Sequence, residues 1–343
     1  MSQPLVSILV PVYKVELYIE RCVRSVFEQT YDNLEFIFCD DCSTDASIQI
    51  LETVMKDYPQ REKQVQIICN ESNRGLAAVR SILVANATGD FVFHIDSDDW
   101  VEKNAVELLV SKQMESAADI VTARAYAHEH NKVEPYLDGG WNLDKQSMME
   151  MMLKGKCSVS LWRRLIRKSL YTGNNLQPDE KGSCCEDFQV MLPLVWYSKS
   201  VVGIDAFIYH YDVTNTNSIT NSYKDNLEIQ LQILISRQVV SVFFSDKNLF
   251  YKNLCDEFAI RQAHFFMIRH WRNNRKEAYS FFVKYIKEFD KQYWSCIKWD
   301  FYLIRMLESN YHLLFVIYFI RRCYSLFSNH FYLKNEESAC HRR

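Results

Sequence analysis

The feature that most constrains this chain is an apolar run that ends abruptly in carboxylates. Phe91 to Ile95 is apolar and β-favouring apart from His94, and Asp96, Asp98 and Asp99 follow within four positions. Such a run is typical of a strand buried on both faces, so the charges must lie where the strand leaves the sheet. In open α/β sheets, ligands bind at the carboxyl ends of the strands.

The spacing of the carboxylates favours a metal site. Side chains alternate along an extended segment, so Asp96 and Asp98 can point the same way. Two carboxylates on one side of a strand end suit Mg²⁺ or Mn²⁺, which such sites commonly share with substrate phosphates. The alternative is a solvated acidic turn in which Asp99 caps the next helix.

Apolar strands and amphipathic helices alternate along the first half of the chain. This order predicts an α/β fold with a mostly parallel, doubly wound sheet. Right-handed crossovers bring the carboxyl ends of its strands to one edge. A helical extension begins at about residue 223. The pattern predicts strands over 6–12, 34–39, 65–69, 91–95, 119–126 and 201–211, and helices over 15–29, 76–87, 102–116, 143–153 and 185–197.

Charge divides the 343 residues into two segments. Residues 1–220 hold 21 Lys+Arg and 31 Asp+Glu, whereas residues 221–343 hold 19 and 12. We expect a catalytic domain over 1–220 and a basic, aromatic helical region over 221–343. The net charge of −3 argues against nucleic acid as a partner. Eleven cysteines without framework spacing, and no basic N-terminal region, predict a cytoplasmic protein.

Two segments of the basic region suggest contact with a membrane surface. Tyr311 to Ile320 is apolar for about ten residues, too short to span a bilayer. Arg261 to Lys276 interleaves cations with aromatic residues. Each helix alone fits ordinary core packing, but the positive bias of the whole region favours peripheral contact with anionic lipid on the inner face of the cell membrane.

Five motifs resemble glycosyltransferase family 2, whose members have the GT-A fold. The resemblance covers about residues 5 to 220, with the motifs in the family's order. The motifs are Pro11-Val12-Tyr13, Asp40-Asp41-Cys42-Ser43-Thr44-Asp45, Asn73-Arg74-Gly75-Leu76-Ala77, Asp96-Ser97-Asp98-Asp99 and Glu186-Asp187, and Tyr209-His210-Tyr211 with Ser218-Ile219-Thr220 resembles the segment that closes the domain.

The resemblance implies a role for each carboxylate. Asp41 would accept a hydrogen bond from the nucleotide base, as an ionised carboxylate suits an N–H of uracil. Asp96 would lie near the ribose and Asp98 would hold the Mg²⁺ or Mn²⁺ that bridges the diphosphate. Asp99 would either touch the sugar or cap the following helix. Asp187 would be the general base, with Glu186 as the neighbouring alternative. Asp40 would shape the turn and Arg80 would lie near the diphosphate. Further nucleotide-sugar contacts are implied for both of these residues and for Pro11, Val12, Tyr13, Glu16, Asn73 and Ser97.

The sequence departs from the family pattern at a few positions. The family usually has Asn where Lys14 stands and Gly where Cys42 stands. Because Gly adopts φ > 0 at little cost and Cys does not, we expect the turn at Cys42 to differ slightly. Asp212 stands where Arg is common, which weakens a diphosphate contact from that segment.

The resulting hypothesis is an inverting, metal-dependent glycosyltransferase of the hexosyltransferase type. It would take a sugar from a nucleoside-diphosphate donor, with UDP as the expected nucleotide. The sugar would go to a hydroxyl of a glycan or of a polyprenyl-diphosphate-linked acceptor in bacterial surface polysaccharide synthesis. The alternatives are a nucleotidyltransferase acting on sugar phosphates and a non-catalytic glycan- or nucleotide-binding module. A nucleotidyltransferase would need a Gly-rich phosphate loop after the first strand, where this sequence has Pro11-Val12-Tyr13-Lys14. A binding module needs no general base, so the presence of Glu186-Asp187 counts against it.

Other polar residues have structural interpretations. Cys39 and Cys42 have the spacing of a redox pair, but the two intervening aspartates oppose a thiolate. His94 lies within a strand and is interpreted as a satisfied core residue. Arg163 and Arg164 would either contact acceptor or phosphate or form a solvated basic face.

Overall fold

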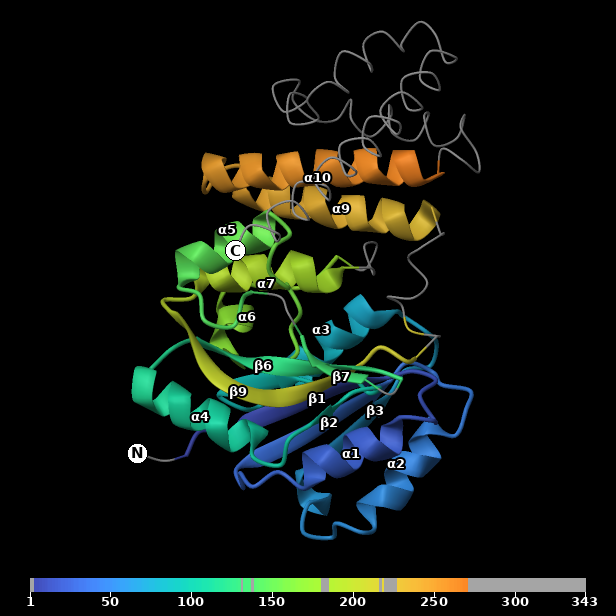
Figure 1. Ribbon diagram of the computed structural model, residues 1–343. Helices are drawn as coiled ribbons and strands as arrows, with labels where there is room; N and C mark the ends of the chain where they lie inside the picture. The colour runs from blue at the N-terminus through green and yellow to red at the C-terminus, as the bar shows by residue number, and fades with distance from the viewer. Residues whose placement is uncertain are drawn as a thin grey trace, which may run out of the picture.

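A computed structural model describes residues 3–130, 132–136, 139–179, 185–215, 218 and 227–270. The predicted tail segment Tyr311 to Ile320, and most of the expected region 221–343, lie outside the described residues. Within them the chain forms one mixed sheet with helices on both faces (Figure 1). The expected α/β class and the predicted alternation of strands and helices are confirmed.

The sheet has the strand order β3-β2-β1-β4-β8-β6-β9-β5, with β7 paired to β6. Its first half is parallel, as predicted, whereas β8 runs antiparallel to both of its neighbours, β4 and β6. The pair β6 and β9 is parallel. The strands are β1 Val6–Val12, β2 Leu34–Asp40, β3 Val65–Cys69, β4 Phe91–His94, β5 Trp100–Val101, β6 Ile120–Glu129, β7 Lys132–Pro135, β8 Arg164–Arg167 and β9 Val201–Asp212.

Strand register places the acidic turns side by side. Val12 of β1 pairs with Asp40 of β2, and Leu9 of β1 pairs with His94 of β4. The three strands are parallel, so their carboxyl ends reach one edge of the sheet within a few residues of each other. Asp41 and Asp96, which directly follow β2 and β4, therefore leave the sheet at the same edge, as the sequence predicts.

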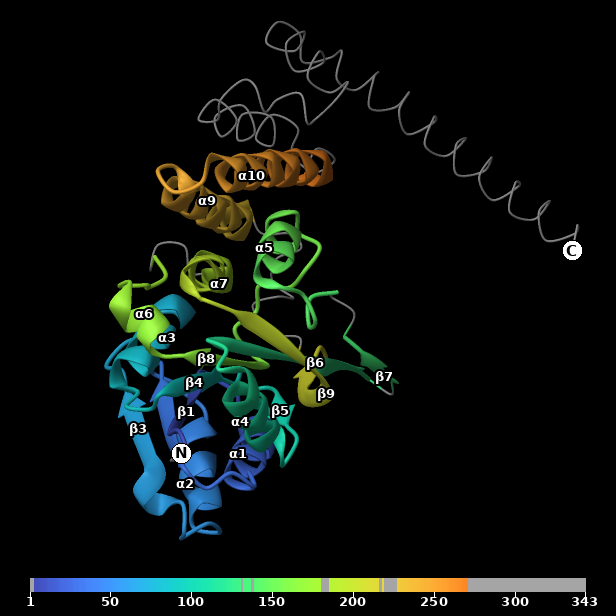
Figure 2. The same cartoon turned by 90° about the vertical axis from the view of Figure 1, so that its left-hand side faces the viewer.

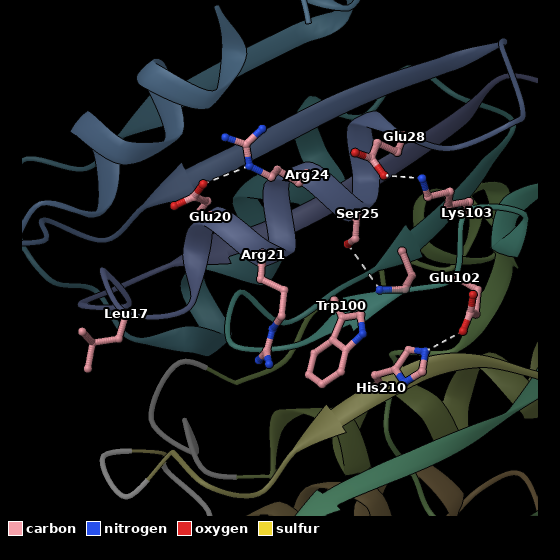
Figure 3. Close-up of a pocket in the computed structure, with 11 residues that line it drawn as sticks. Leu17, Glu20, Arg21, Arg24, Ser25, Glu28, Trp100, Glu102, Lys103 and His210 are labelled. Atoms are coloured by element: carbon pink, nitrogen blue, oxygen red, sulfur yellow. Dashed lines mark hydrogen bonds and ion pairs between the residues drawn. The ribbon is translucent and has the colours of Figure 1, made fainter. Parts of the chain in front are cut away.

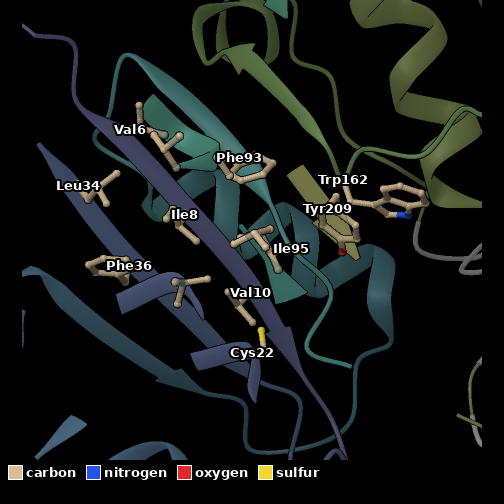
Figure 4. Close-up of a cluster of buried hydrophobic side chains, with 14 of the residues drawn as sticks. Val6, Ile8, Val10, Cys22, Leu34, Phe36, Phe93, Ile95, Trp162 and Tyr209 are labelled. Carbon is tan, nitrogen blue, oxygen red and sulfur yellow. The ribbon is translucent and has the colours of Figure 1, made fainter. Parts of the chain in front are cut away.

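Alternation along the central strands builds two separate cores. Val6, Ile8 and Val10 of β1 pack on one face, whereas Leu9 packs on the other. Figure 4 shows Ile8 on the first face between Phe36 of β2 and Phe93 of β4. Burial on both faces explains why these strands are almost continuously apolar.

Different helices cover the two faces. The first core is closed by α1 Ile19–Phe27, α2 Ser47–Met55 and α4 Ala105–Ser116. The second is closed by α3 Leu76–Asn86, α5 Lys145–Leu153, α6 Ser169–Gly173 and α7 Glu186–Tyr197. Figure 2 shows α5 and α7 on the side of the sheet that faces α9 Leu227–Phe244 and α10 Leu249–His270; a short 3₁₀ helix, Glu62–Gln64, precedes β3.

The helices α9 and α10 share the second core. Val240, Phe244 and Cys255 are fully or almost fully buried in the same cluster as α7. Gln189 Nε2 of α7 donates to Ser236 Oγ of α9 at 2.9 Å. No helix within the described residues is long and apolar enough to cross a membrane.

Candidate functional site

The turn after β4 is anchored by a buried tyrosine of β9. Tyr209 Oη donates to Asp99 Oδ2 at 2.7 Å and accepts from the Asp96 N–H at 3.1 Å. Asp99 also accepts from the Asp212 N–H at 2.8 Å and is fully buried. The prediction that Asp99 caps the next helix is wrong, because α4 begins at Ala105 and Asp99 instead ties the turn to β9.

Fixing Asp99 leaves Asp96 and Asp98 as the carboxylates available at the strand end. The Asp96 side chain is 27% exposed. Asp98 Oδ2 accepts from Asn215 Nδ2 at 2.9 Å. Burial, followed by the nearby charge of Asp96, raises the pKa of Asp98 to about 6. A bound cation would favour the ionised form of Asp98 and offset the repulsion between the two carboxylates.

Arg80 of α3 lies between this turn and the N-terminus of α7. Its Nη2 is 3.0 Å from Asp96 Oδ1, its Nε is 2.9 Å from Glu186 Oε1, and Nε is 3.6 Å from Asp187 Oδ1. The Arg80 side chain is only 4% exposed. A single buried cation therefore joins three carboxylates that the sequence places in two distant motifs.

Asp187 is poised to hold a proton. Its Oδ2 accepts from the Leu161 N–H at 3.3 Å, whereas the buried Oδ1 has no hydrogen-bond partner among the described residues. Burial raises the pKa of Asp187 to about 8, against the opposing effect of Arg80. Burial also raises the pKa of Glu186, but Glu186 is already engaged in the bond from Arg80 Nε. The geometry favours Asp187 over Glu186 as the proton acceptor.

A second polar pair lies under Arg80. His94 Nε2 is 3.1 Å from Tyr171 Oη, and both side chains are buried. Burial, followed by the charge of Arg80, holds the pKa of His94 well below its usual range. His94 is a neutral core residue, as expected, although its Nδ1 has no hydrogen-bond partner within the described chain.

Asp41 holds the loop between β3 and α3. Its carboxylate accepts from the N–H groups of Arg74 and Gly75, both at 2.8 Å, and from Asn70 Nδ2 at 2.8 Å. Asn73 Nδ2 donates to the Asp41 carbonyl at 3.4 Å. A carboxylate has about four acceptor sites. Asp41 therefore retains about one for a further donor.

The remaining residues of the expected nucleotide side lie around the same edge. Asp40 accepts from the Ser43 N–H at 3.1 Å and shapes the turn, as predicted. Glu16 accepts from the Ala46 N–H at 2.9 Å, at the start of α2. Tyr13, directly after β1, is 42% exposed. The other three are buried: Pro11 and Val12 at the end of β1, and Ser97 within the acidic turn.

Two positions that depart from the family pattern have left-handed backbone angles. Lys14 has φ of 52° and Cys42 has φ of 63°. Asn and Gly tolerate such left-handed angles, which other residues adopt at a cost. The expectation that the turn at Cys42 differs from that of the family stays a prediction. Burial, followed by the Asp41 charge, raises the pKa of Cys39 to about 12, in agreement with the rejection of a redox pair.

The prediction for Arg163 and Arg164 is wrong in both of its forms. Both side chains are completely buried at the start of β8. Arg163 Nη1 donates to the Ala123 carbonyl at 3.2 Å, and Arg164 Nη2 donates to the Ser158 carbonyl at 3.0 Å. They therefore satisfy backbone carbonyls of β6 and of the segment before β8 rather than facing a phosphate or solvent.

Sequence reasoning missed three residues that hold the acidic turn. Arg21 Nη2 donates to the Asp98 carbonyl at 2.9 Å and pairs with Asp212 at 2.7 Å. Asn215 and Tyr209 complete the set, as described above. The only signal for them was the motif around Tyr209, which was noted without a role. At position 212, where Arg is common in the family, this chain therefore has a carboxylate that pairs with Arg21 of α1.

The donor set fits a divalent cation shared with a ligand. Asp96 and Asp98 are hard-oxygen donors. No group of three or more His, Cys, Asp or Glu side chains able to hold a metal occurs within the described residues. The protein therefore offers two carboxylates, and the other ligands would come from water and a bound phosphate, as in many Mg²⁺ sites.

The arrangement of sheet and helices is that of known transferases. The fold is similar to the crystal structure of S. aureus TarS residues 1–349 in complex with UDP, with a TM-score of 0.66 and 17% identity over 90% of this chain and 91% of that one. The architecture is therefore a GT-A fold. The relatives that match in sequence are themselves named glycosyltransferases, and this protein is of the same class.

Sequence comparison gives the family. The model of glycosyl transferase family 2 matches residues 7–172. The chain is 31% identical over 236 residues to the uncharacterized glycosyltransferase EpsJ of Bacillus subtilis (strain 168), covering 67% of each protein. It is 28% identical over 281 residues to the putative glycosyltransferase EpsH of the same strain, covering 80% of this chain and 79% of EpsH. The chain belongs to glycosyltransferase family 2, which sets aside the nucleotidyltransferase and the non-catalytic module.

Proposed function

We propose that this protein is an inverting, metal-dependent glycosyltransferase that uses a UDP-sugar to extend a glycan during bacterial polysaccharide synthesis. The observation that carries the proposal is the cluster around Arg80. It brings the Asp96–Asp98 turn, suited to a metal and diphosphate, next to Asp187, suited to accept a proton. Similarity to the protein named putative teichuronic acid biosynthesis glycosyltransferase TuaG, of Bacillus subtilis (strain 168), supports the glycan context.

The donor would bind across the carboxyl edge of β1, β2 and β4. The remaining acceptor site of Asp41 suits the N–H of uracil, and the exposed ring of Tyr13 offers a surface against which a base can stack. Asp96 lies on the ribose side. The UDP complex of the similarly folded TarS supports uridine as the nucleotide.

Asp98, with Asp96, would hold Mg²⁺ or Mn²⁺. The cation would stabilise negative charge on the departing nucleoside diphosphate. The guanidinium of Arg80 would also attract a donor phosphate, but it is 4% exposed and is covered by the carboxylates with which it pairs. Its role in this proposal is to keep Asp96, Glu186 and Asp187 together in one buried cluster.

Asp187 would take the proton of the acceptor hydroxyl as that oxygen attacks the anomeric carbon. The bond to the Leu161 N–H holds one oxygen in place, and Oδ1, which lies 3.6 Å from Arg80 Nε without a hydrogen bond among the described residues, is the oxygen that would accept. The raised pKa makes Asp187 a stronger base than an exposed aspartate once it is ionised. A single displacement of this kind inverts the anomeric carbon.

We place this chemistry in residues 1–220 and assign residues 221–343 to acceptor or membrane contact. The acceptor would be a glycan, free or carried on a polyprenyl diphosphate, at the cytoplasmic face of the cell membrane. Support for the second segment is its excess of Lys and Arg. Comparing vesicle partition of the full chain with that of a chain ending at residue 270 tests the assignment, and equal partition would refute it.

A panel of UDP-, GDP- and dTDP-sugars tests the donor and the metal. Thermal unfolding is measured with each nucleotide sugar, with and without Mn²⁺ or Mg²⁺. A ligand that binds the folded state raises the unfolding temperature. We expect the UDP-sugars to stabilise the protein only with metal. Stabilisation by none of them, or equally without metal, contradicts the proposal.

A further inference from the structure

A groove of about 670 Å³ lies beside the acidic turn, outside the cluster around Arg80. One wall is a single face of α1 and the turn before it, since its residues are spaced three or four apart. The other wall comes from β5, the residues after it, and β9 (Figure 3). The lining residues are Leu17, Glu20, Arg21, Arg24, Ser25 and Glu28 on the first wall, and Trp100, Val101, Glu102, Lys103 and His210 on the second.

The groove begins beside the backbone of the acidic turn. Arg21, which lines it, donates to the carbonyl of Asp98 at 2.9 Å. Trp100 follows Asp98 by two positions. From there the groove follows α1 toward Glu28, and at 1.5 Å per residue the helical part from Glu20 to Glu28 is about 12 Å long. A chain bound in the groove would therefore run from the acidic turn along the helix.

The charges in the groove are balanced and already paired. Arg24 pairs with Glu20 at 2.9 Å, and Lys103 pairs with Glu28 at 2.9 Å. His210 Nε2 lies 2.9 Å from Glu102 Oε1, and Arg21 is paired with Asp212. A polyanion such as a second nucleotide or an acidic glycan would need unpaired cations here. The groove instead offers many hydrogen-bonding groups without net charge.

The groove also has apolar and aromatic surface. Leu17 is 83% exposed and Val101 lies opposite. The partly exposed Trp100 is held in place by two neighbours: Arg21 Cζ lies 3.6 Å from the centre of the ring, and the His210 ring stacks parallel to it at 4.9 Å. A rigid aromatic group among hydrogen-bonding side chains suits a ligand with both C–H faces and hydroxyl groups.

We propose that this groove binds a neutral oligosaccharide, namely the part of the acceptor glycan that lies beyond the reacting sugar. The assignment rests on the proposed function for its connection to transfer, while the binding itself follows from the groove. It names the acceptor class as an oligosaccharide long enough to reach α1 and without acidic sugars in that section.

Groove-filling variants test the proposal. Glu20 is 59% exposed and pairs with a cation four positions away, so Glu20→Trp should fold normally while occupying the groove. Glu115→Trp is the matched control, because Glu115 is 70% exposed on α4, pairs with Lys112 three positions away, and does not line the groove. Wild type and both variants are titrated with neutral oligosaccharides from disaccharide to hexasaccharide and with uronic-acid oligosaccharides, by calorimetry without donor.

We expect wild type and Glu115→Trp to bind the neutral series more tightly as the chain lengthens, and Glu20→Trp to lose at least tenfold in affinity. Absence of neutral binding, equal binding by Glu20→Trp, or a preference for the uronic-acid series overturns the proposal. Acceptor-free release of UDP from UDP-sugars is measured in parallel and should be the same in all three proteins. If wild type releases no UDP from any UDP-sugar but still binds the glycans, the proposed function is refuted and the groove assignment stands.

Discussion

Replacing Asp187 by Asn separates the catalytic role of its charge from the stability of the fold. The substitution keeps the shape of the side chain and an oxygen that can accept from the Leu161 N–H. Arg80 retains its ion pairs with Asp96 and Glu186, so no buried cation is left uncompensated. We expect kcat to fall by about 10²- to 10⁴-fold, the contribution typical of a general base.

The same substitution should make the protein more stable at neutral pH. The pKa of Asp187 rises from 3.8 to about 8 on folding because the side chain is buried. Between these values the folded state binds more protons than the unfolded state, so wild-type stability falls as pH rises. One pKa unit corresponds to about 1.4 kcal/mol. Since Glu186 titrates in the same cluster, we expect the advantage of Asp187→Asn to grow by roughly 2 to 4 kcal/mol between pH 4.5 and pH 7.5.

Urea denaturation across this pH range, in metal-free buffer, measures the difference. The control is Asp205→Asn, since Asp205 is 67% exposed and its loss should leave the pH dependence unchanged. Parallel stability curves for wild type and Asp187→Asn would refute the raised pKa. Full transfer activity in Asp187→Asn would move the base to Glu186 or to another residue.

Three further predictions concern the acidic turn, the buried Arg80 and the turn after β2. Asp98→Asn should abolish transfer and remove the metal-dependent part of UDP binding in calorimetry; a wild type that binds UDP equally with and without Mn²⁺ would contradict the metal role. Arg80→Met should lower the free energy of unfolding by about 3 to 5 kcal/mol, because it leaves buried carboxylates without their cation. An unchanged urea midpoint at pH 7 would contradict the role of Arg80 in holding the three carboxylates together. Cys42→Gly should stay within about 0.5 kcal/mol of wild type, since relief of the left-handed strain offsets the added freedom of the unfolded chain. Cys69→Gly, in strand β3, should cost about 1 kcal/mol, so equal losses in the two glycine variants would show that Cys42 is not strained.

The architecture was predictable because it rests on local periodicity. Short, largely apolar and β-branched runs such as Val6–Val12 favour strands buried on both faces, and their alternation with amphipathic helices leaves few topologies. Strand direction in the second half was less accessible. Nothing local distinguishes β8 Arg164–Arg167 as antiparallel, because strand direction is set by the path of the connections.

The site was predictable in its carboxylates but not in the contacts between them. Asp96, Asp98 and Asp187 follow from position and resemblance, and the structure brings them together through Arg80. The position of the Asp99 side chain depends on a hydrogen bond from Tyr209, which lies 110 positions away in the sequence. Local sequence patterns do not encode contacts at such a separation.

The buried arginines show the same limit. Arg163 and Arg164 look like a basic surface in the sequence, yet both are enclosed and donate to buried carbonyl groups, Arg163 to Ala123 of β6 and Arg164 to Ser158. Composition predicts where charged side chains usually lie, and only the tertiary structure shows where buried carbonyls require them.

The anomeric configuration of the product tests the central claim most directly. The protein is incubated with Mn²⁺, an α-linked UDP-sugar and an oligosaccharide acceptor, and the new linkage is read from the anomeric proton by NMR. The account predicts a β-linked product, formed by wild type and lost in Asp187→Asn, because Asp187 activates the acceptor for one direct displacement. An α-linked product would require two displacements and would contradict the role assigned to the Arg80 cluster.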